Sequence, residues 1–168
     1  QGITMGEAPM NDLFYLDTET VTWKRVDAEA PPSPRSFHQM VSVGEKLFVF
    51  GGCGASGRLN DLHCFDTSIN AWKALPTGPE DLKPRGGAAL APSPDHESLL
   101  VMGGFSGQEM GDVWRFSLVD NTWSRSEHDL PRPRSVTSCA LVGKQVVIVG
   151  GEVDPSDKGH EGAGGFDS

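Results

Sequence analysis

The chain repeats one pattern about every 50 residues, and this repeat limits the folds that it can adopt. The tryptophans Trp23, Trp72 and Trp123 are 49 and 51 residues apart. Three other marks recur every 47–52 residues: Asp12, Asp61 and Asp112; Arg35, Arg85 and Arg134; and Gly-Gly steps that begin at Gly51, Gly103 and Gly150. Because four independent marks share one period, we expect an array of similar supersecondary units.

The unit is clearest in residues 47–72. Four apolar residues at 47–50 predict a buried strand, because a strand covered on both faces has no polar side to show. The Gly-Gly step at 51–52 is expected to end this strand, since glycine turns without a Cβ penalty. A second strand leads into a turn of Asx and Ser/Thr residues at 66–70. Trp72 then lies on another strand.

A period near 50 with four strands in each unit is typical of a propeller blade. An apolar strand ending in Gly-Gly, then a loop, then a tryptophan, resembles the kelch repeat. The resemblance covers nearly the whole chain and implies an all-β, kelch-type β-propeller with about three blades' worth of four-stranded antiparallel sheets. The expected divisions are a partial blade at 1–34, whole blades at 35–84 and 85–133, and a partial blade with an acidic loop at 134–168.

Residue size predicts the radial order of the strands. The first strand of a unit is expected to begin at Phe37, Gly86 and Val136. Small residues fill it, as at 87–89 and 138–140, so this strand is expected innermost, where blades crowd together. The tryptophans are expected on the outermost strand, where each covers a large apolar area.

Three blades' worth of strands is fewer than the 4–8 blades of most propellers. An open arc would leave unpaired strand edges, which are templates for pairing with another chain. Two explanations stay open: the remaining blades belong to a longer propeller, or a second chain completes the ring.

Composition limits the classes of molecule that the chain is expected to bind. A net charge of −9 and a pI near 4.9 argue against nucleic acid and against an anionic membrane surface, since both need a positive footprint. No apolar run approaches the roughly 20 residues that span a bilayer. Three cysteines form no CxxC pair, which favours a reducing, cytoplasmic location over a disulfide framework.

Arg35, Arg85 and Arg134 are candidate ligand-binding residues. Each stands just before an expected innermost strand, so the three should approach one mouth of the channel. Guanidinium groups there suit a protein partner with an acidic segment, or a small anionic ligand such as a sulfate or carboxylate. The alternative is structural: each arginine pairs with a loop carboxylate or carbonyl. The repeated aspartates are expected to have a structural role, such as turn capping.

The loop after the last Gly-Gly step is a candidate metal site. Carboxylates and one imidazole lie within ten residues, at Glu152, Asp154, Asp157, His160 and Glu161. Such a mixed oxygen and nitrogen set suits Fe(II). A solvated acidic loop is the alternative.

The stretch at 143–164 resembles the matching blade of plant specifier proteins, which include nitrile-specifier and thiohydroximate-forming proteins. That family depends on Fe(II) and redirects the breakdown of glucosinolate aglucones, and its iron motif is Glu-x3-Asp-x3-His. Glu152 and His160 match the motif, whereas Ser156 takes the central position and Asp157 follows one residue later. The resemblance implies Glu152, Asp157 and His160 as iron ligands.

Two functions follow. The first is a specifier-like propeller that binds a ligand or protein through its loop face, with Fe(II) steering aglucone breakdown and the arginines holding the sulfate. The alternative is a scaffold propeller without metal that binds another protein. No GxSxG or HExxH motif is present, so no catalytic residue is assigned.

Overall fold

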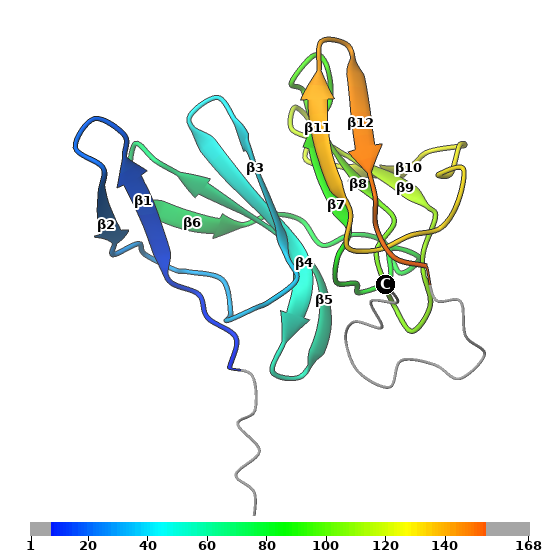
Figure 1. Cartoon of the computed structure of the whole chain (residues 1–168), viewed down its shortest axis with the longest axis horizontal. Helices are drawn as coiled ribbons and strands as arrows, with labels where there is room; N and C mark the ends of the chain where they lie inside the picture. Colours follow the sequence, from blue (N-terminus) through cyan, green and yellow to red (C-terminus); the bar gives the residue numbers. More distant parts are fainter. Residues whose placement is uncertain (1–7, 154–168) are drawn as a thin grey trace, which may run out of the picture.

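The computed structural model describes residues 8–153, which form antiparallel β-strands and no helix (Figure 1). The strands are β1 (Leu13–Asp17), β2 (Thr22–Val26), β3 (Gln39–Val43), β4 (Lys46–Gly54), β5 (Gly57–Asp66), β6 (Ala71–Ala74), β7 (Ala89–Pro92), β8 (Ser98–Met102), β9 (Val113–Ser117), β10 (Trp123–Arg125), β11 (Ser138–Val142) and β12 (Gln145–Val149). The all-β class is therefore confirmed. In this part of the chain nothing helical has the length and apolarity to cross a membrane.

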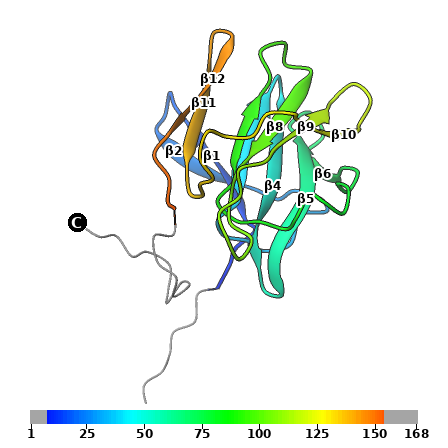
Figure 2. The same ribbon diagram turned by 90° about the vertical axis from the view of Figure 1, so that its right-hand side faces the viewer.

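The strands form two whole blades and two half-blades. Strands β3-β4-β5-β6 make one four-stranded sheet and β7-β8-β9-β10 the next, and every neighbouring pair is antiparallel. The half-blades are the two-stranded sheets β1-β2 and β11-β12. Figure 2 shows both half-blades on the same side of the whole blades, so the four sheets form an open arc. Three blades' worth of strands is what the repeat predicted.

The first strands of successive blades lie side by side. Strand β7 contacts β3 on one side and β11 on the other, which confirms these strands as the innermost layer. Ala89 and Ala91 are fully buried at this contact, where only small side chains let two backbones come close.

The main core lies between the two whole blades. Phe50 of β4 and Phe116 of β9 are buried there, and each contributes about 1.5–3 kcal/mol through lost apolar surface. The ring of Trp123 packs on both, with centroids 5.9 Å and 5.0 Å away. Its Nε1–H donates to the carbonyl of Pro76 at 2.9 Å. One outer tryptophan thus ties its own blade to the preceding one.

The first Gly-Gly step does not end its strand, contrary to the sequence prediction. Strand β4 runs on through Gly51 and Gly52, with a register shift after Phe50. The two glycines have φ of +62° and +100°, so the chain bends while pairing with β5 continues. A Cβ on Gly52 would lie 2.6 Å from the Ser36 carbonyl oxygen, and only glycine fits there. In the next blade, β8 ends before Gly103 as expected.

The innermost strands begin two or three residues later than the sequence predicted. Phe37, Gly87 and Val136 stand just before them and have φ of +52°, +62° and +52°. A left-handed residue breaks the extended pattern, so pairing starts only beyond it. The turn at 66–70 forms as predicted: the Asp66 carboxylate accepts hydrogen bonds from the backbone N–H and the hydroxyl of Ser68.

Candidate functional site

The three repeated arginines share one conformation at the loop end of the blades. In Arg35, Arg85 and Arg134, Nε–H donates to the carbonyl two residues earlier, at 3.1, 2.9 and 3.3 Å. Nη1 of each donates to the carbonyl of the first glycine of the Gly-Gly step in its own blade, at 3.1, 3.0 and 3.1 Å. The repeat therefore gives each guanidinium group the same two backbone contacts.

The repeated aspartates complete this arrangement in the whole blades. Asp61 accepts two hydrogen bonds from Arg35, at 2.8 and 2.9 Å, and Asp112 accepts two from Arg85, at 2.5 and 2.9 Å. Both guanidinium groups are buried. The structural alternative considered for the arginines is thus what these two blades show. The aspartates are structural as expected, but as partners of arginine rather than as turn caps.

A third donor joins each carboxylate from two residues further along the strand. His63 Nε2 lies 2.7 Å from Asp61 Oδ2, and Trp114 Nε1–H donates to Asp112 Oδ2 at 2.5 Å. Burial alone would raise the pKa of both carboxyls. The hydrogen bonds from His63 and Arg35 outweigh burial and hold the pKa of Asp61 below its usual range. Arg85 and Trp114 do the same for Asp112.

Arg134 differs because no carboxylate meets it in residues 8–153. It is only partly buried, with its backbone contacts in place. Asp12 shows the opposite case. It is an exposed carboxylate that pairs with no cation of the described chain. Of the three expected ligand-binding residues, Arg134 alone has free donors within this part of the molecule.

A second group, which we call the inner rim, consists of Phe37, Gly87 and Val136. They stand two residues after the three arginines, and backbone hydrogen bonds link them in a row: Gly87 N–H donates to the Phe37 carbonyl at 2.9 Å, and Val136 N–H donates to the Gly87 carbonyl at 2.8 Å. The side chains of Phe37 and Val136 are 47% and 49% exposed. The inner rim therefore presents apolar side chains to solvent at the loop end of the innermost strands.

The inner rim was not predicted from the sequence. The signal was available in the repeat alignment, because one of the three equivalent positions is glycine. A glycine in one repeat indicates a backbone that needs positive φ in all of them. Phenylalanine and valine are therefore unexpected residues at such a position.

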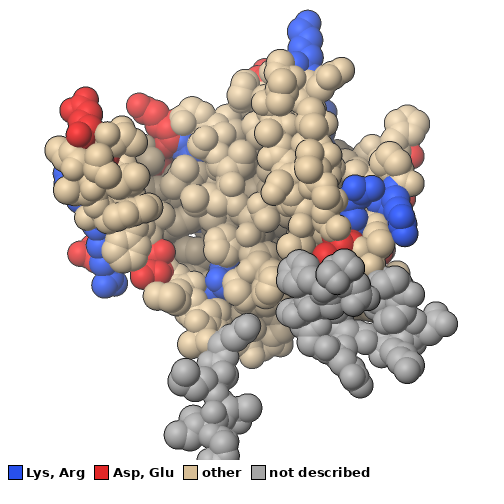
Figure 3. All heavy atoms as spheres, viewed as in Figure 1, with Lys and Arg blue, Asp and Glu red and all other residues tan. Residues whose placement is uncertain are grey.

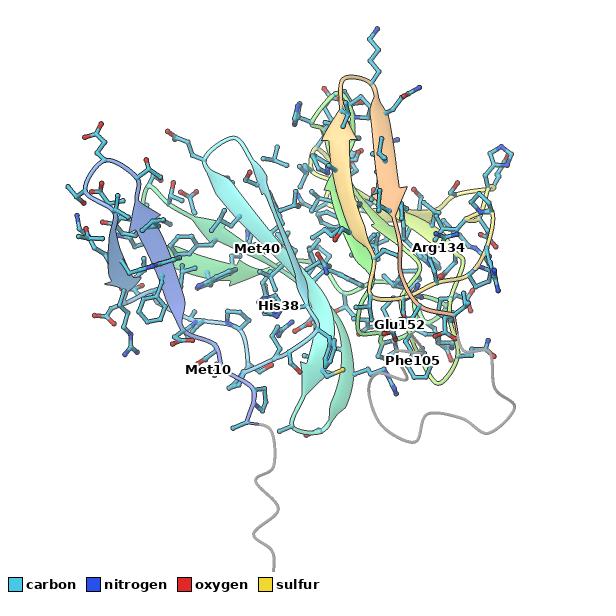
Figure 4. The ribbon with its side chains drawn as sticks, in the orientation of Figure 1. Met10, His38, Met40, Phe105, Arg134 and Glu152 are labelled. Atoms are coloured by element: carbon cyan, nitrogen blue, oxygen red, sulfur yellow. The ribbon has the colours of Figure 1, made fainter. Side chains whose placement is uncertain are left out.

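The residues around the inner rim come from several elements. His38 and Met40 lie on or next to β3, whereas Phe105, Arg134 and Glu152 lie near the loop end of the next sheets (Figure 4). The guanidinium carbon of Arg58 lies 4.6 Å from the centre of the Phe105 ring, a contact that joins the loops of the two whole blades. Figure 3 shows that the face seen in this view is largely uncharged, with charged side chains mostly at its margins.

The expected iron site falls mainly outside the described residues. Glu152 is described, and its backbone pairs with Ser135 at 3.0 and 2.8 Å beside Arg134. Asp157 and His160 lie outside residues 8–153. Within those residues, no three His, Cys, Asp or Glu side chains gather as metal ligands would. The described chain thus supplies one of the three expected donors, and the Fe(II) site stays a prediction.

The comparison with known proteins agrees with this geometry. The family model for the KLHDC2/KLHL20/DRC7 kelch-repeats domain matches residues 2–151. The chain belongs to the kelch-repeat family. Among its relatives, kelch domain-containing protein 2 of Bos taurus is 37% identical over 83% of this chain and 35% of its own length.

Further relatives match a similar portion of this chain. Human kelch domain-containing protein 3 is 30% identical over 89% of this chain and 42% of its own length. The host cell factor of Drosophila melanogaster is 32% identical over 85% of this chain and 11% of its own length. The chain thus spans well under half the length of these kelch relatives. None of the three is named as a specifier protein, and that resemblance stays an interpretation of the loop at 143–164.

Proposed function

We propose that this kelch chain is a protein-interaction module that binds a polypeptide segment at its inner rim. The observation that carries the proposal is the pair Phe37 and Val136. Both are apolar, half-exposed and left-handed. A left-handed conformation costs about 1–2 kcal/mol in a bulky residue such as phenylalanine or valine. Folding alone would favour glycine, as at Gly87, so the side chains are retained for contact with something outside the fold.

The chemistry around the inner rim favours apolar contacts. Arg35 and Arg85 are already paired with aspartates, so neither has donors to spare for an anion. Burial, and then the charge of Arg35, lower the pKa of His38, which favours the neutral form of this neighbouring imidazole. An exposed apolar side chain of the partner therefore finds apolar contacts at Phe37 and Val136.

The test is a peptide selection followed by affinity measurements. Peptides selected from a random display library on the wild-type chain are titrated by fluorescence anisotropy against Phe37→Gly, Val136→Gly and the control Val119→Gly. Glycine keeps the positive φ and removes only the side chain. We expect at least about tenfold weaker binding for both rim variants, a loss of about 1.4 kcal/mol, and no change for Val119→Gly. Equal affinity in all four proteins would contradict the proposal.

A second candidate is the specifier activity that the loop at 143–164 suggests. It is supported by the matching positions of Glu152 and His160 and by the place of Glu152 beside Arg134. Bound Fe(II) would supply Lewis-acid or one-electron chemistry, and Arg134 would hold the sulfate of the aglucone. Anaerobic calorimetry of Fe(II) with the wild type and His160→Ala tests it. Micromolar binding that the variant loses is expected, and no binding by either protein would refute it.

We also infer a reducing compartment such as the cytoplasm. The three cysteines Cys53, Cys64 and Cys139 are unpaired in the described chain. Burial raises the pKa of the Cys64 and Cys139 thiols, which keeps both protonated and unreactive at neutral pH. Fractionation of cells that express the chain tests this inference, and a secreted, disulfide-linked product would contradict it.

A further inference from the structure

The sequence contains two Ser-Pro dipeptides, Ser33-Pro34 and Ser93-Pro94, and no Thr-Pro. A serine followed directly by proline is the acceptor that proline-directed protein kinases phosphorylate, provided that the hydroxyl group is accessible. The two serines differ in this respect. Ser33 is exposed in the linker before β3, whereas Ser93 is only 6% exposed in the turn between β7 and β8. Of the two, Ser33 alone offers its hydroxyl group to an enzyme.

The linker around Ser33 is extended and rich in proline. Pro31, Pro32 and Pro34 have no N–H to donate, and each ring fixes φ of its own residue near −65°. A residue that precedes a proline, as Ser33 does, is also kept out of the helical region. Pro32 is buried and anchors the linker, while Pro31 and Pro34 are exposed on either side of it. The linker therefore presents an extended Ser-Pro segment at the surface.

The hydroxyl group of Ser33 already contacts a buried cation. Its Oγ accepts a hydrogen bond from Nη2–H of Arg35 at 3.2 Å, and its carbonyl accepts one from Nε–H at 3.1 Å. The side chain of Arg35 is only 3% exposed. Its other hydrogen bonds go to the Gly51 carbonyl and to the Asp61 carboxylate. A phosphate group on Ser33 Oγ would therefore form within reach of a guanidinium group that is already fixed in place.

The repeat itself does not require this hydroxyl group. The equivalents of Ser33 are Lys83 and Arg132, which stand two residues before Arg85 and Arg134. Their carbonyls accept a hydrogen bond from the following arginine, as that of Ser33 does. Their side chains are cations, which have no oxygen to accept one. The repeated arginine is thus held without a neighbouring hydroxyl group in the other two repeats, so Ser33 is a particular feature of the blade that contains β3.

We propose that Ser33 is phosphorylated by a proline-directed kinase and that Arg35 holds the phosphate. Ser33 Oγ attacks the γ-phosphorus of ATP, the Oγ–P bond forms as the bond to ADP breaks, and the hydroxyl proton passes to a base of the kinase. The phosphate takes over the Nη2–H donor that the hydroxyl oxygen uses now, so no spare donor is needed, and a charged acceptor is bound more strongly than a neutral one. This site does not depend on peptide binding at the inner rim.

The phosphate and Asp61 would share one guanidinium group. Asp61 accepts hydrogen bonds from Arg35 at 2.8 and 2.9 Å, and a phosphate adds about 1.5–2 negative charges beside it. The two anions therefore compete for one cation and repel each other. In Asp61→Asn the phosphate is the counter-charge that remains for Arg35, whose burial makes an unpaired charge costly. Phosphorylation should thus favour folding more in Asp61→Asn than in the wild type.

The first experiment locates the phosphate. The folded full chain is incubated with MgATP and a purified mitogen-activated or cyclin-dependent protein kinase, and the modified residues are mapped by mass spectrometry. We expect phosphate on Ser33 and at least tenfold less on Ser93. Ser33→Ala should lose this incorporation, whereas Ser68→Ala, an exposed serine without a following proline, should keep it. A folded chain in which neither kinase modifies Ser33, or in which both modify Ser93 instead, would overturn the proposal.

The second experiment tests the contact with Arg35. Urea midpoints are measured for the wild type and Asp61→Asn, each with and without phosphate. Phosphorylation should raise the midpoint of Asp61→Asn, and by more than it changes that of the wild type; equal changes would contradict a phosphate held by Arg35. Nuclear magnetic resonance of the wild type gives a readout without any variant. The Nε–H signal of Arg35 should shift on phosphorylation while that of Arg85 stays in place, and an unchanged Arg35 signal would also overturn the contact.

Discussion

Arg85 is fully buried, and its charge is balanced by one carboxylate, that of Asp112. Asp112→Asn leaves the guanidinium group buried without its counter-charge, and breaking such a pair costs about 3–5 kcal/mol. We expect the free energy of unfolding in urea to fall by about that amount. Asp120→Asn, in an exposed turn, is the matched control and should change it by less than about 0.5 kcal/mol. Similar values for the two variants would refute a structural role for the pair.

The same ion pair predicts the response to acid. The pKa of Asp112 is lower in the folded chain than its ordinary value near 4, because the Arg85 and Trp114 hydrogen bonds outweigh burial. A carboxyl with a depressed folded pKa contributes stability above its unfolded pKa and loses it as the pH falls towards the folded pKa. Unfolding free energies measured below about pH 4 should therefore fall more steeply in the wild type than in Asp112→Asn. Parallel pH profiles would contradict this assignment.

Val136 is a β-branched residue at φ +52°, where side chains are strained. Val136→Gly should keep or raise the free energy of unfolding, by up to about 1 kcal/mol, because glycine removes the strain. Val119→Gly is the control at an exposed turn without positive φ, and it should lower the free energy of unfolding by about 0.5–1 kcal/mol. A rim variant that loses as much stability as the control would show that Val136 serves the fold.

At the scale of the strands, Gly52 carries the bend of β4. Its φ is +100°, and a Cβ would meet a backbone oxygen rather than a flexible side chain. Gly44 is the matched control, since its φ is +57° and a Cβ there meets nothing within 4 Å. Gly44→Ala should cost about 1 kcal/mol, and Gly52→Ala several times more, because the linker at Ser36 must move. Equal urea midpoints for the two variants would contradict this account of the bulge.

The repeat predicted the sheets well, because apolar runs and turn residues are local signals. It predicted the strand starts less well, because a left-handed residue precedes the first strand of each unit and only one of the three, Gly87, is a glycine. It also left two roles open for the repeated arginines, namely ligand binding and pairing with a loop carboxylate or carbonyl. Whether a guanidinium group meets a ligand or a carboxylate 26 or 27 residues away depends on register and burial, which only the fold supplies.

The predicted metal site shows a second limit of prediction from sequence. Glu152 lies beside Arg134, but its expected companions Asp157 and His160 fall outside the described residues. A ligand set is held by backbone geometry that spacing alone does not determine, and here the spacing itself departs from the specifier motif at Ser156. The Fe(II) titration is therefore the test of this loop.

At the scale of the whole molecule, the same backbone hydrogen bonds recur at each junction between successive blades. Arg85 N–H donates to the Leu59 carbonyl of the preceding blade, and Gly52 N–H donates to the Arg85 carbonyl. Equivalent bonds join Met110, Gly104 and Arg134 at the next junction. Each blade is stabilised by the blades next to it in sequence, so the loop ends of the blades form one continuous, hydrogen-bonded face.

Binding of a polypeptide at the inner rim can be tested by amide exchange with and without a selected peptide. We expect slower exchange at the backbone around Phe37, Gly87 and Val136, and unchanged exchange in the outermost strands β6 and β10. Protection confined to β6 and β10, with no change at the inner rim, would contradict it.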